Sequence, residues 1–134
     1  MIALDEIARL IAAAAAARDN AYAPYSNFRV GAALLTDTGV VVTGCNIENV
    51  SYGATLCAER TAVAKAVSEG HRCFRAIAVV YDAVALARPC GLCRQVLMEF
   101  APDADVIMAN TAGAYECESV RALLPAAFSP NSIG

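Results

Sequence analysis

Two short cysteine-containing segments are the part of this sequence best suited to chemistry. In the first, Glu59 follows Cys57 by two positions, and the second is a Pro-Cys-x-x-Cys motif that contains Cys90 and Cys93. Structural zinc sites fill all four tetrahedral positions with Cys or His, whereas hydrolytic zinc sites leave one position for water. We therefore predict a Zn²⁺ site with Cys57, Cys90 and Cys93 as ligands and an open fourth position.

The residues beside Cys57 suggest how such a site would work. A carboxylate next to a metal that can hold water serves as a proton carrier, so we predict that Glu59 is the general base and then the general acid. Zn²⁺ with three thiolates is formally negative and should acidify water poorly. Arg60 lies three positions after Cys57, a helical spacing that lets its guanidinium donate to the thiolates. Arg88 is a second candidate for this charge balance.

Three structural interpretations of the same cysteines remain open. Glu59 could be a fourth zinc ligand, or the site could be a closed knuckle completed by Cys45, Cys73 or Cys117. Six cysteines in a short chain could also form a disulfide framework, but without an export signal metal binding or catalysis is the commoner explanation. The combination of both motifs favours the catalytic site.

Hydrophobic periodicity and turn residues predict an α/β chain. The first half is expected to contain a helix over about residues 3–18, an antiparallel hairpin with strands 27–35 and 40–45 around a turn at 37–39, and a helix over 58–69. The same signals continue in the second half. It is expected to contain a strand at 74–81, a helix at 91–100, strands at 104–110 and 115–118, and a last helix capped by Ser119 and reaching Leu124.

This order places both cysteine segments at the start of a helix. Cys57 lies where a loop enters the helix at 58–69, and Cys90 and Cys93 lie where a strand leads into the helix at 91–100. The N–H groups and partial positive charge of a helix N-terminus lower thiol pKa values and favour the thiolates that metals require. The predicted ligands are therefore prepared for zinc.

Length and composition limit the remaining possibilities. A chain of 134 residues fits one domain, residues 1–134, and its 58% apolar content exceeds the roughly 45–50% of typical soluble chains, which suggests apolar surface buried against other subunits. The net charge is −3 and cations are not clustered, so no nucleic-acid partner is expected. No apolar run approaches the ~18 residues that span a bilayer, so no membrane partner is expected. Asp5 and Glu6 argue against an export signal and favour the cytoplasm.

Beyond the zinc motifs, several blocks resemble the small, homotetrameric, three-cysteine zinc cytidine deaminases of nucleoside salvage. The resemblance covers nearly the whole chain, in the order found in that family. It is carried by residues 24–33 (PYSNFRVGAA), 44–49 (GCNIEN), 57–62 (CAERTA), 89–95 (PCGLCRQ) and 123–130 (LLPAAFSP). It implies a three-layer α/β/α fold, in which a mixed sheet of about five strands carries helices on both faces.

The resemblance also implies substrate-binding residues. Asn46 and Glu48 match the residues that hold the ribose hydroxyls, and Phe28 matches the residue that packs against the pyrimidine. The backbone near Ala58 is expected to contact the ring edge. Tyr52 and Phe128 match aromatic residues that reach the active site of a neighbouring subunit.

The implied reaction is the zinc-dependent hydrolytic deamination of cytidine and 2′-deoxycytidine to uridine and 2′-deoxyuridine, with release of ammonia. The alternatives are deamination of a modified cytosine nucleoside such as an antibiotic, or of a free base, and a non-catalytic zinc-stabilised interaction module. Editing of a polynucleotide fits the acidic chain less well. Residues 84–88, apolar except for Arg88, depart from the family pattern beside the predicted zinc site.

Overall fold

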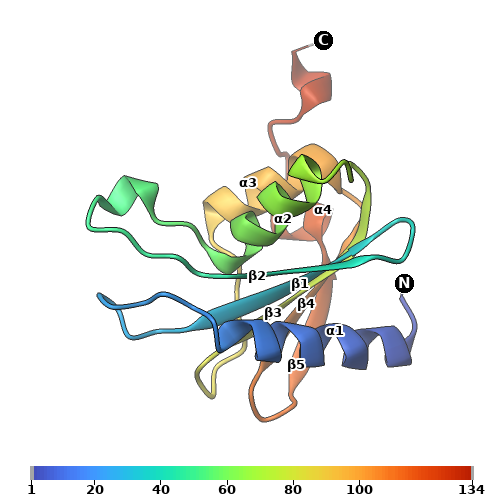
Figure 1. Cartoon of the computed structure of the whole chain (residues 1–134). Coiled ribbons are helices and arrows are strands. Elements are labelled where there is room, and N and C mark those ends of the chain that lie inside the picture. Colours follow the sequence, from blue (N-terminus) through green and yellow to red (C-terminus); the bar gives the residue numbers. More distant parts are fainter. Residues whose placement is uncertain (1, 134) are drawn as a thin grey trace.

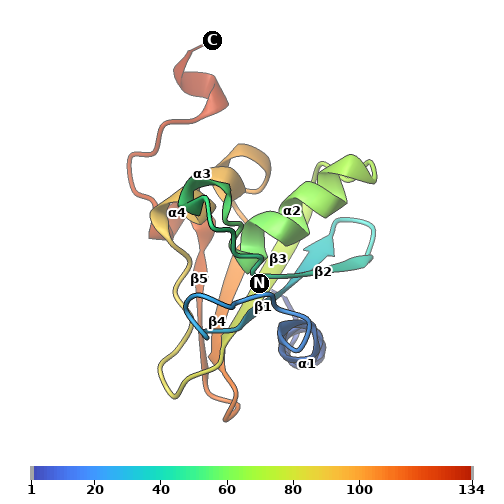
Figure 2. The same cartoon turned by 60° about the vertical axis from the view of Figure 1, so that its left-hand side comes forward.

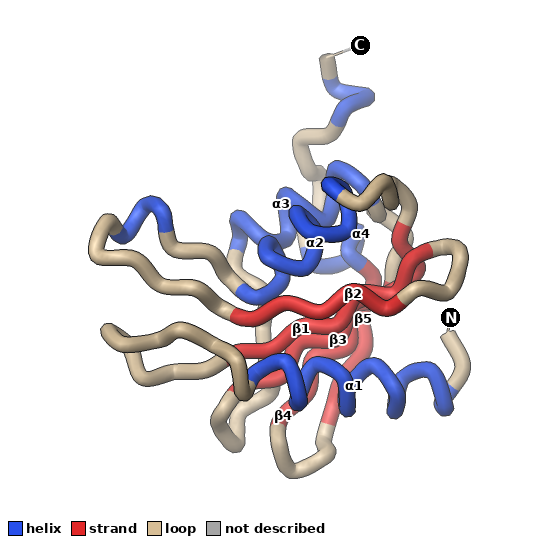
Figure 3. Tube along the Cα trace, in the orientation of Figure 1, coloured by secondary structure: helices blue, strands red, loops and turns tan. Residues whose placement is uncertain are grey.

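The computed structural model describes residues 2–133, and its centre is a sheet of five strands in the order β2-β1-β3-β4-β5. The strands are β1 (Val30–Thr36), β2 (Val41–Cys45), β3 (Phe74–Tyr81), β4 (Asp105–Asn110) and β5 (Tyr115–Ser119). Strands β3 and β4 pair in parallel, whereas the other neighbours are antiparallel. The sheet is therefore mixed, as predicted, and its strands lie side by side between the helices (Figure 3).

Helices cover both faces of this sheet. Helix α1 (Leu4–Arg18) lies on one face, and α2 (Ala58–Ser68), α3 (Gly91–Phe100) and the short α4 (Val120–Leu123) lie on the other (Figures 1 and 2). Ser119 caps α4 by accepting a hydrogen bond from the Ala122 N–H at 3.0 Å. The three-layer α/β/α prediction is confirmed.

The core is divided by the sheet into two apolar clusters. The cluster beneath α2 and α3 contains Leu34, Ile77 and Met108, and the cluster beneath α1 contains Leu35, Val80 and Ile107. Successive side chains of a strand point to opposite faces, so the apolar strands β1, β3 and β4 contribute to both clusters. This burial fixes the strands from which the site segments extend.

Two glycines allow helices to approach the sheet closely. A Cβ at Gly31 would lie 1.9 Å from the Ala14 carbonyl oxygen in α1, and a Cβ at Gly44 would lie 2.6 Å from the Ala58 carbonyl oxygen in α2. Any residue larger than glycine at these two positions would collide with the helix backbone, so the helix would have to move away from the sheet. Gly44 thereby determines how close the start of α2 lies to β2.

Most predicted boundaries agree with the structure within one residue, but β1 begins at Val30 and not at position 27. Asn27 has a φ of 57°, outside the extended region, and the Ser26 hydroxyl accepts the Phe28 N–H at 3.0 Å. The Val30 N–H donates to Asn46 Oδ1 at 2.9 Å. A side-chain-stabilised turn therefore replaces the first predicted strand residues and places Phe28 outside the sheet.

Two segments extend away from the layers. One is the loop between β2 and α2, which contains the 3₁₀ turn Tyr52–Ala54, and the other is the segment after α4, which ends with the 3₁₀ turn Pro130–Ser132 (Figure 1). Within residues 2–133, no helix combines the length and apolar character needed to cross a membrane.

Candidate active site

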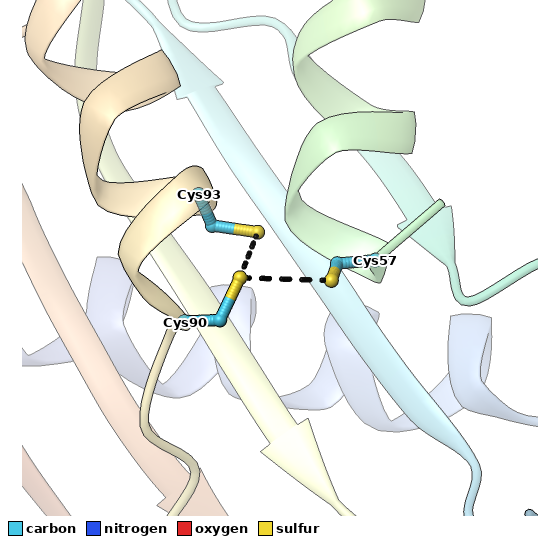
Figure 4. Close-up of side chains that lie close together, drawn as sticks. All are labelled: Cys57, Cys90 and Cys93. Carbon is cyan, nitrogen blue, oxygen red and sulfur yellow. Dashed lines mark hydrogen bonds between the residues drawn. The ribbon is translucent and has the colours of Figure 1, made fainter. Parts of the chain in front are cut away.

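Three cysteine sulfurs converge at the starts of α2 and α3 (Figure 4). Cys90 Sγ lies 3.8 Å from Cys57 Sγ and 3.5 Å from Cys93 Sγ, and all three sulfurs lie within 4.8 Å of one another. Tetrahedral zinc with Zn–S bonds of about 2.3 Å separates its sulfurs by about 3.8 Å. The cluster therefore has the chemistry and the spacing of a zinc site.

The closed four-cysteine site is not formed by the described residues. Cys45, Cys73 and Cys117 lie outside the cluster, and all six cysteines are free thiols. Glu59 is not part of the cluster either. The disulfide framework and the cysteine knuckle are thus contradicted, and the three predicted ligands stand alone.

The sulfurs lie in a strongly polarised environment. Hydrogen bonds from Cys93 and Arg60 lower the pKa of the Cys57 thiol to about 5 against the cost of burial. The Arg60 Nη2 atom lies 3.4 Å from Cys57 Sγ. The pKa of Cys93 is raised by its hydrogen bond to Cys57 and then by burial. Metals bind thiolates, so metal binding would displace the proton that the cysteines share.

Glu59 lies in the first turn of α2 and is only 4% exposed. Burial raises the pKa of its carboxyl to about 7, and the nearby charge of Cys57 contributes in the same direction. A carboxyl with a pKa close to neutral can both accept and donate a proton at physiological pH. The arrangement therefore suits a proton carrier.

A pocket of about 270 Å³ is lined by Cys57, Cys90 and Glu59, together with other predicted residues. Four residues that the sequence assigns to the substrate line it, namely Phe28, Asn46, Glu48 and Ala58. A larger hollow of about 560 Å³ lies beside α1, but Cys, His, Asp and Glu are absent from its lining. Of these two hollows, only the smaller one is lined by residues of the cysteine cluster.

Glu48 and Asn46 are held by hydrogen bonds at this pocket. Glu48 Oε1 accepts the N–H groups of Tyr25 and Ser26 at 3.0 and 3.1 Å, and Oε2 accepts the Ser26 hydroxyl, which lowers the pKa of the carboxyl. Asn46 Nδ2 donates to the Phe28 carbonyl at 2.8 Å. Both side chains are preorganised, and each keeps polar capacity for a further partner.

Tyr52 and Phe128 do not line this pocket. Tyr52 is 79% exposed and meets Tyr25 edge-on at 6.4 Å, and Phe128 is 63% exposed, with its carbonyl accepting from Gln95 Nε2 at 2.8 Å. The two segments that carry them are the ones that extend from the layers (Figure 1). The described chain therefore leaves both aromatic side chains turned to solvent.

The structure adds residues to the pocket, among them Tyr81, and corrects one assignment. Tyr81 lines the pocket. It was not assigned to the site from the sequence, and the only signal for it was its place at the carboxyl end of a predicted buried strand. Arg88 does not balance the thiolate charge, because its Nη1 atom pairs with Glu116 at 2.9 Å and contacts the Met108 sulfur at 3.6 Å. Among the two candidates, only Arg60 reaches the cluster.

An α/β/α fold with three convergent cysteines and a buried glutamate beside them defines the class of zinc-dependent deaminases. The family model described as the cytidine and deoxycytidylate deaminase zinc-binding region matches residues 4–110. The chain belongs to this family, and the Zn²⁺ prediction is confirmed by the match together with the sulfur cluster.

Individual relatives agree with this assignment. The cytidine deaminase of Sporosarcina psychrophila is 50% identical over 129 residues, which cover 96% of this chain and 95% of the relative. The cytidine deaminase of Halalkalibacterium halodurans is 54% identical over 121 residues, which cover 90% and 92%. The crystal structure of cytidine deaminase from Burkholderia pseudomallei superposes with a TM-score of 0.88 at 52% identity, covering 90% of this chain and 98% of that one.

Proposed function

We propose that the protein catalyses the zinc-dependent hydrolytic deamination of cytidine and 2′-deoxycytidine to uridine and 2′-deoxyuridine, with release of ammonia, in pyrimidine salvage in the cytoplasm. The observation that carries the proposal is the convergence of Cys57, Cys90 and Cys93 next to the buried carboxyl of Glu59, beside a pocket that Cys57, Cys90 and Glu59 line. The named relatives support the choice of substrate.

The three cysteines would hold Zn²⁺, which when bound supplies Lewis-acid chemistry that eases the deprotonation of water. Glu59 accepts the proton of the attacking water and delivers it to N3 of the pyrimidine as oxygen bonds to C4. It then takes the proton of the C4 hydroxyl and delivers it to the 4-amino group, so that the C4–N4 bond breaks, the C4 carbonyl forms and ammonia leaves. Water and cytidine are thereby converted to uridine and ammonia, with Glu59 returned to its starting state.

The remaining pocket residues orient the nucleoside. Glu48, ionised and held by Ser26, accepts hydrogen bonds from ribose hydroxyls, and Asn46 adds a donor and an acceptor beside it. Phe28 packs against the base, and a first-turn N–H of α2 near Ala58 meets the ring edge. This grip on the sugar favours a nucleoside over a free base.

The whole chain, residues 1–134, serves as one catalytic domain that assembles into a homotetramer with shared active sites. Tyr52 and Phe128 then complete the pocket of a neighbouring subunit, which accounts for their exposure in a single subunit. The net charge of −3 disfavours binding to a polyanion such as nucleic acid.

The test measures the loss of cytidine ultraviolet absorbance together with ammonia release by the zinc-loaded protein. We expect activity that a chelator abolishes and added Zn²⁺ restores. Glu59→Gln keeps a side chain of the same shape but cannot carry protons, so its kcat should fall roughly 100- to 10,000-fold while zinc stays bound.

Glu99→Gln is the matched control, because Glu99 is exposed on α3 and its change should leave kcat unaltered. Equal turnover by the wild type and Glu59→Gln would contradict the assigned role of Glu59. A zinc-bound wild type inactive on cytidine would instead support an interaction module, and activity on free cytosine or single-stranded DNA would redirect the proposal to those substrates.

A further inference from the structure

Tyr81 is a pocket residue to which the proposed reaction gives no task. It is the last residue of β3, is half-buried, and lines the pocket together with Phe28 and Cys90. Its hydroxyl donates a 2.5 Å hydrogen bond to the carbonyl of Arg88, two positions before Cys90. Its ring meets Phe28 edge-on, with 5.0 Å between the centroids and 73° between the planes. The ring is thus held both at its hydroxyl and at its side.

The segment that receives this hydrogen bond is itself anchored. The Ala87 N–H donates to the Ala109 carbonyl at 3.1 Å, and the buried Asn110 donates through Nδ2 to the Val84 carbonyl at 2.7 Å. Arg88 pairs with Glu116 in β5 at 2.9 Å. Because β4 and β5 hold this segment, the Tyr81 ring cannot be displaced without breaking several contacts. It forms a fixed wall of the pocket.

The chemistry of the pocket indicates which atom of the base faces this wall. On the proposed function, on which this inference rests, C4 lies at the sulfur cluster and N3 lies at Glu59 on the α2 side. In a pyrimidine, C5 lies on the other side of C4 from N3. Glu59 belongs to α2, whereas Tyr81 at the end of β3 is hydrogen-bonded to the segment that leads to Cys90 and lines the pocket with Arg88. We assign the C5 side of the base to Tyr81.

We propose that Tyr81 is a specificity-determining residue, whose anchored ring limits the space beside C5 and discriminates against cytidines that carry a bulky C5 substituent. The hydroxyl positions the ring through Arg88, and the ring itself supplies the steric limit. A bulky C5 substituent would have to displace the ring or the anchored segment, and displacing closely packed groups has a high free-energy cost.

The test compares kcat/KM for cytidine, 5-methylcytidine and 5-iodocytidine. We expect the ratio of 5-iodocytidine to cytidine to rise at least about tenfold in Tyr81→Ala, and by less in Tyr81→Phe, which keeps the ring but loses its anchor. Any electronic effect of iodine on C4 is common to all variants and cancels between them. Tyr115→Ala, a tyrosine at the start of β5 outside this pocket, should keep the wild-type ratio.

A second readout is independent of turnover. The ratio of the Kd of 5-iodouridine to the Kd of uridine should be lower in Tyr81→Phe than in the wild type, and lowest in Tyr81→Ala. If Tyr81→Ala does not fold, Tyr81→Leu takes its place in both experiments. A wild type that deaminates cytidine, with the same substrate ratio in Tyr81→Ala or Tyr81→Leu, would overturn the role of Tyr81 alone. A wild type without cytidine turnover would overturn the proposed function and this inference together.

Discussion

The central problem at the scale of residues is the charge of the sulfurs. Three thiolates around one divalent cation leave a net negative centre, which holds a water proton more tightly than a neutral or positive one. The Arg60 guanidinium lies 3.4 Å from Cys57 Sγ and also donates to the Thr55 carbonyl, which fixes its direction. Arg60 is therefore positioned to withdraw charge from Cys57, and it does not line the pocket.

Arg60→Gln should retain zinc but slow catalysis. Hydrogen bonds to charged groups contribute about 1.5–3 kcal/mol, so a comparable loss in the transition state lowers kcat by roughly 10- to 100-fold. Zinc content per subunit and kcat are measured together. Arg72→Gln is the control, because Arg72 is exposed, lies beyond the end of α2 and donates to the Val67 carbonyl at 2.6 Å. Wild-type turnover in Arg60→Gln would refute the charge-balancing role.

At the scale of elements, the site depends on where two helices begin. Cys57 and Cys90 are the residues directly before α2 and α3, and both have extended φ and ψ angles. The α2 start is set by close packing on β2, where the Gly44 position meets the backbone of Ala58 and Ala62. A shift of α2 along this contact would move a metal ligand and Glu59 at once.

Gly44→Ala should therefore disturb both stability and activity. Its Cβ would meet Ala58 O and Ala62 N at 2.6 Å, both backbone atoms, so α2 must move away from β2. Overpacking of this kind costs about 1–3 kcal/mol, which denaturant unfolding of the zinc-bound protein measures. Gly53→Ala has open space around its Cβ and should change the free energy of unfolding by less than about 0.5 kcal/mol. If both variants had the same free energy of unfolding, close packing at Gly44 would not determine the distance between α2 and β2.

At the scale of the whole molecule, the described subunit has features that suit assembly. Its composition is 58% apolar, and the segments carrying Tyr52 and Phe128 project from the layers with exposed aromatic rings. Exposed aromatic side chains on projecting segments are typical of contacts between subunits. Shared active sites would make the proposed tetramer necessary for catalysis.

Mixing two defective variants tests this arrangement. Phe128→Ala should lower kcat/KM about tenfold by removing a stacking partner, and Glu59→Gln should be nearly inactive. In mixed tetramers, a subunit with intact Glu59 can receive Phe128 from its Glu59→Gln neighbour. Activity of co-refolded mixtures should therefore exceed the average of the two pure variants. Mixtures whose activity equals the average of the two pure variants would contradict shared active sites. So would wild-type protein that light scattering shows to be monomeric under conditions in which it is active.

The prediction from sequence was most successful where the signal was local. The helix periodicity, the capping residue Ser119 and the spacing of the cysteine motifs each depend on a few neighbouring residues, and the structure reproduces them. The start of β1 was misplaced, because the turn at Asn27 depends on contacts of Asn46 sixteen positions beyond Val30. The suggestion that Arg88 balances the thiolate charge was wrong for the same reason, because its partner Glu116 lies 28 positions away, in β5.

The sequence by itself determined the α/β order and placed the predicted zinc ligands and Glu59 at the starts of two helices, because propensity, capping and motif spacing are short-range properties of the chain. Only the tertiary structure decided that Tyr81 forms a pocket wall, that Ser26 holds Glu48, and that Arg60, not Arg88, reaches the sulfurs. Those outcomes follow from packing between segments far apart in the sequence, where the register of the sheet and the close approach of helices select each side chain's neighbours.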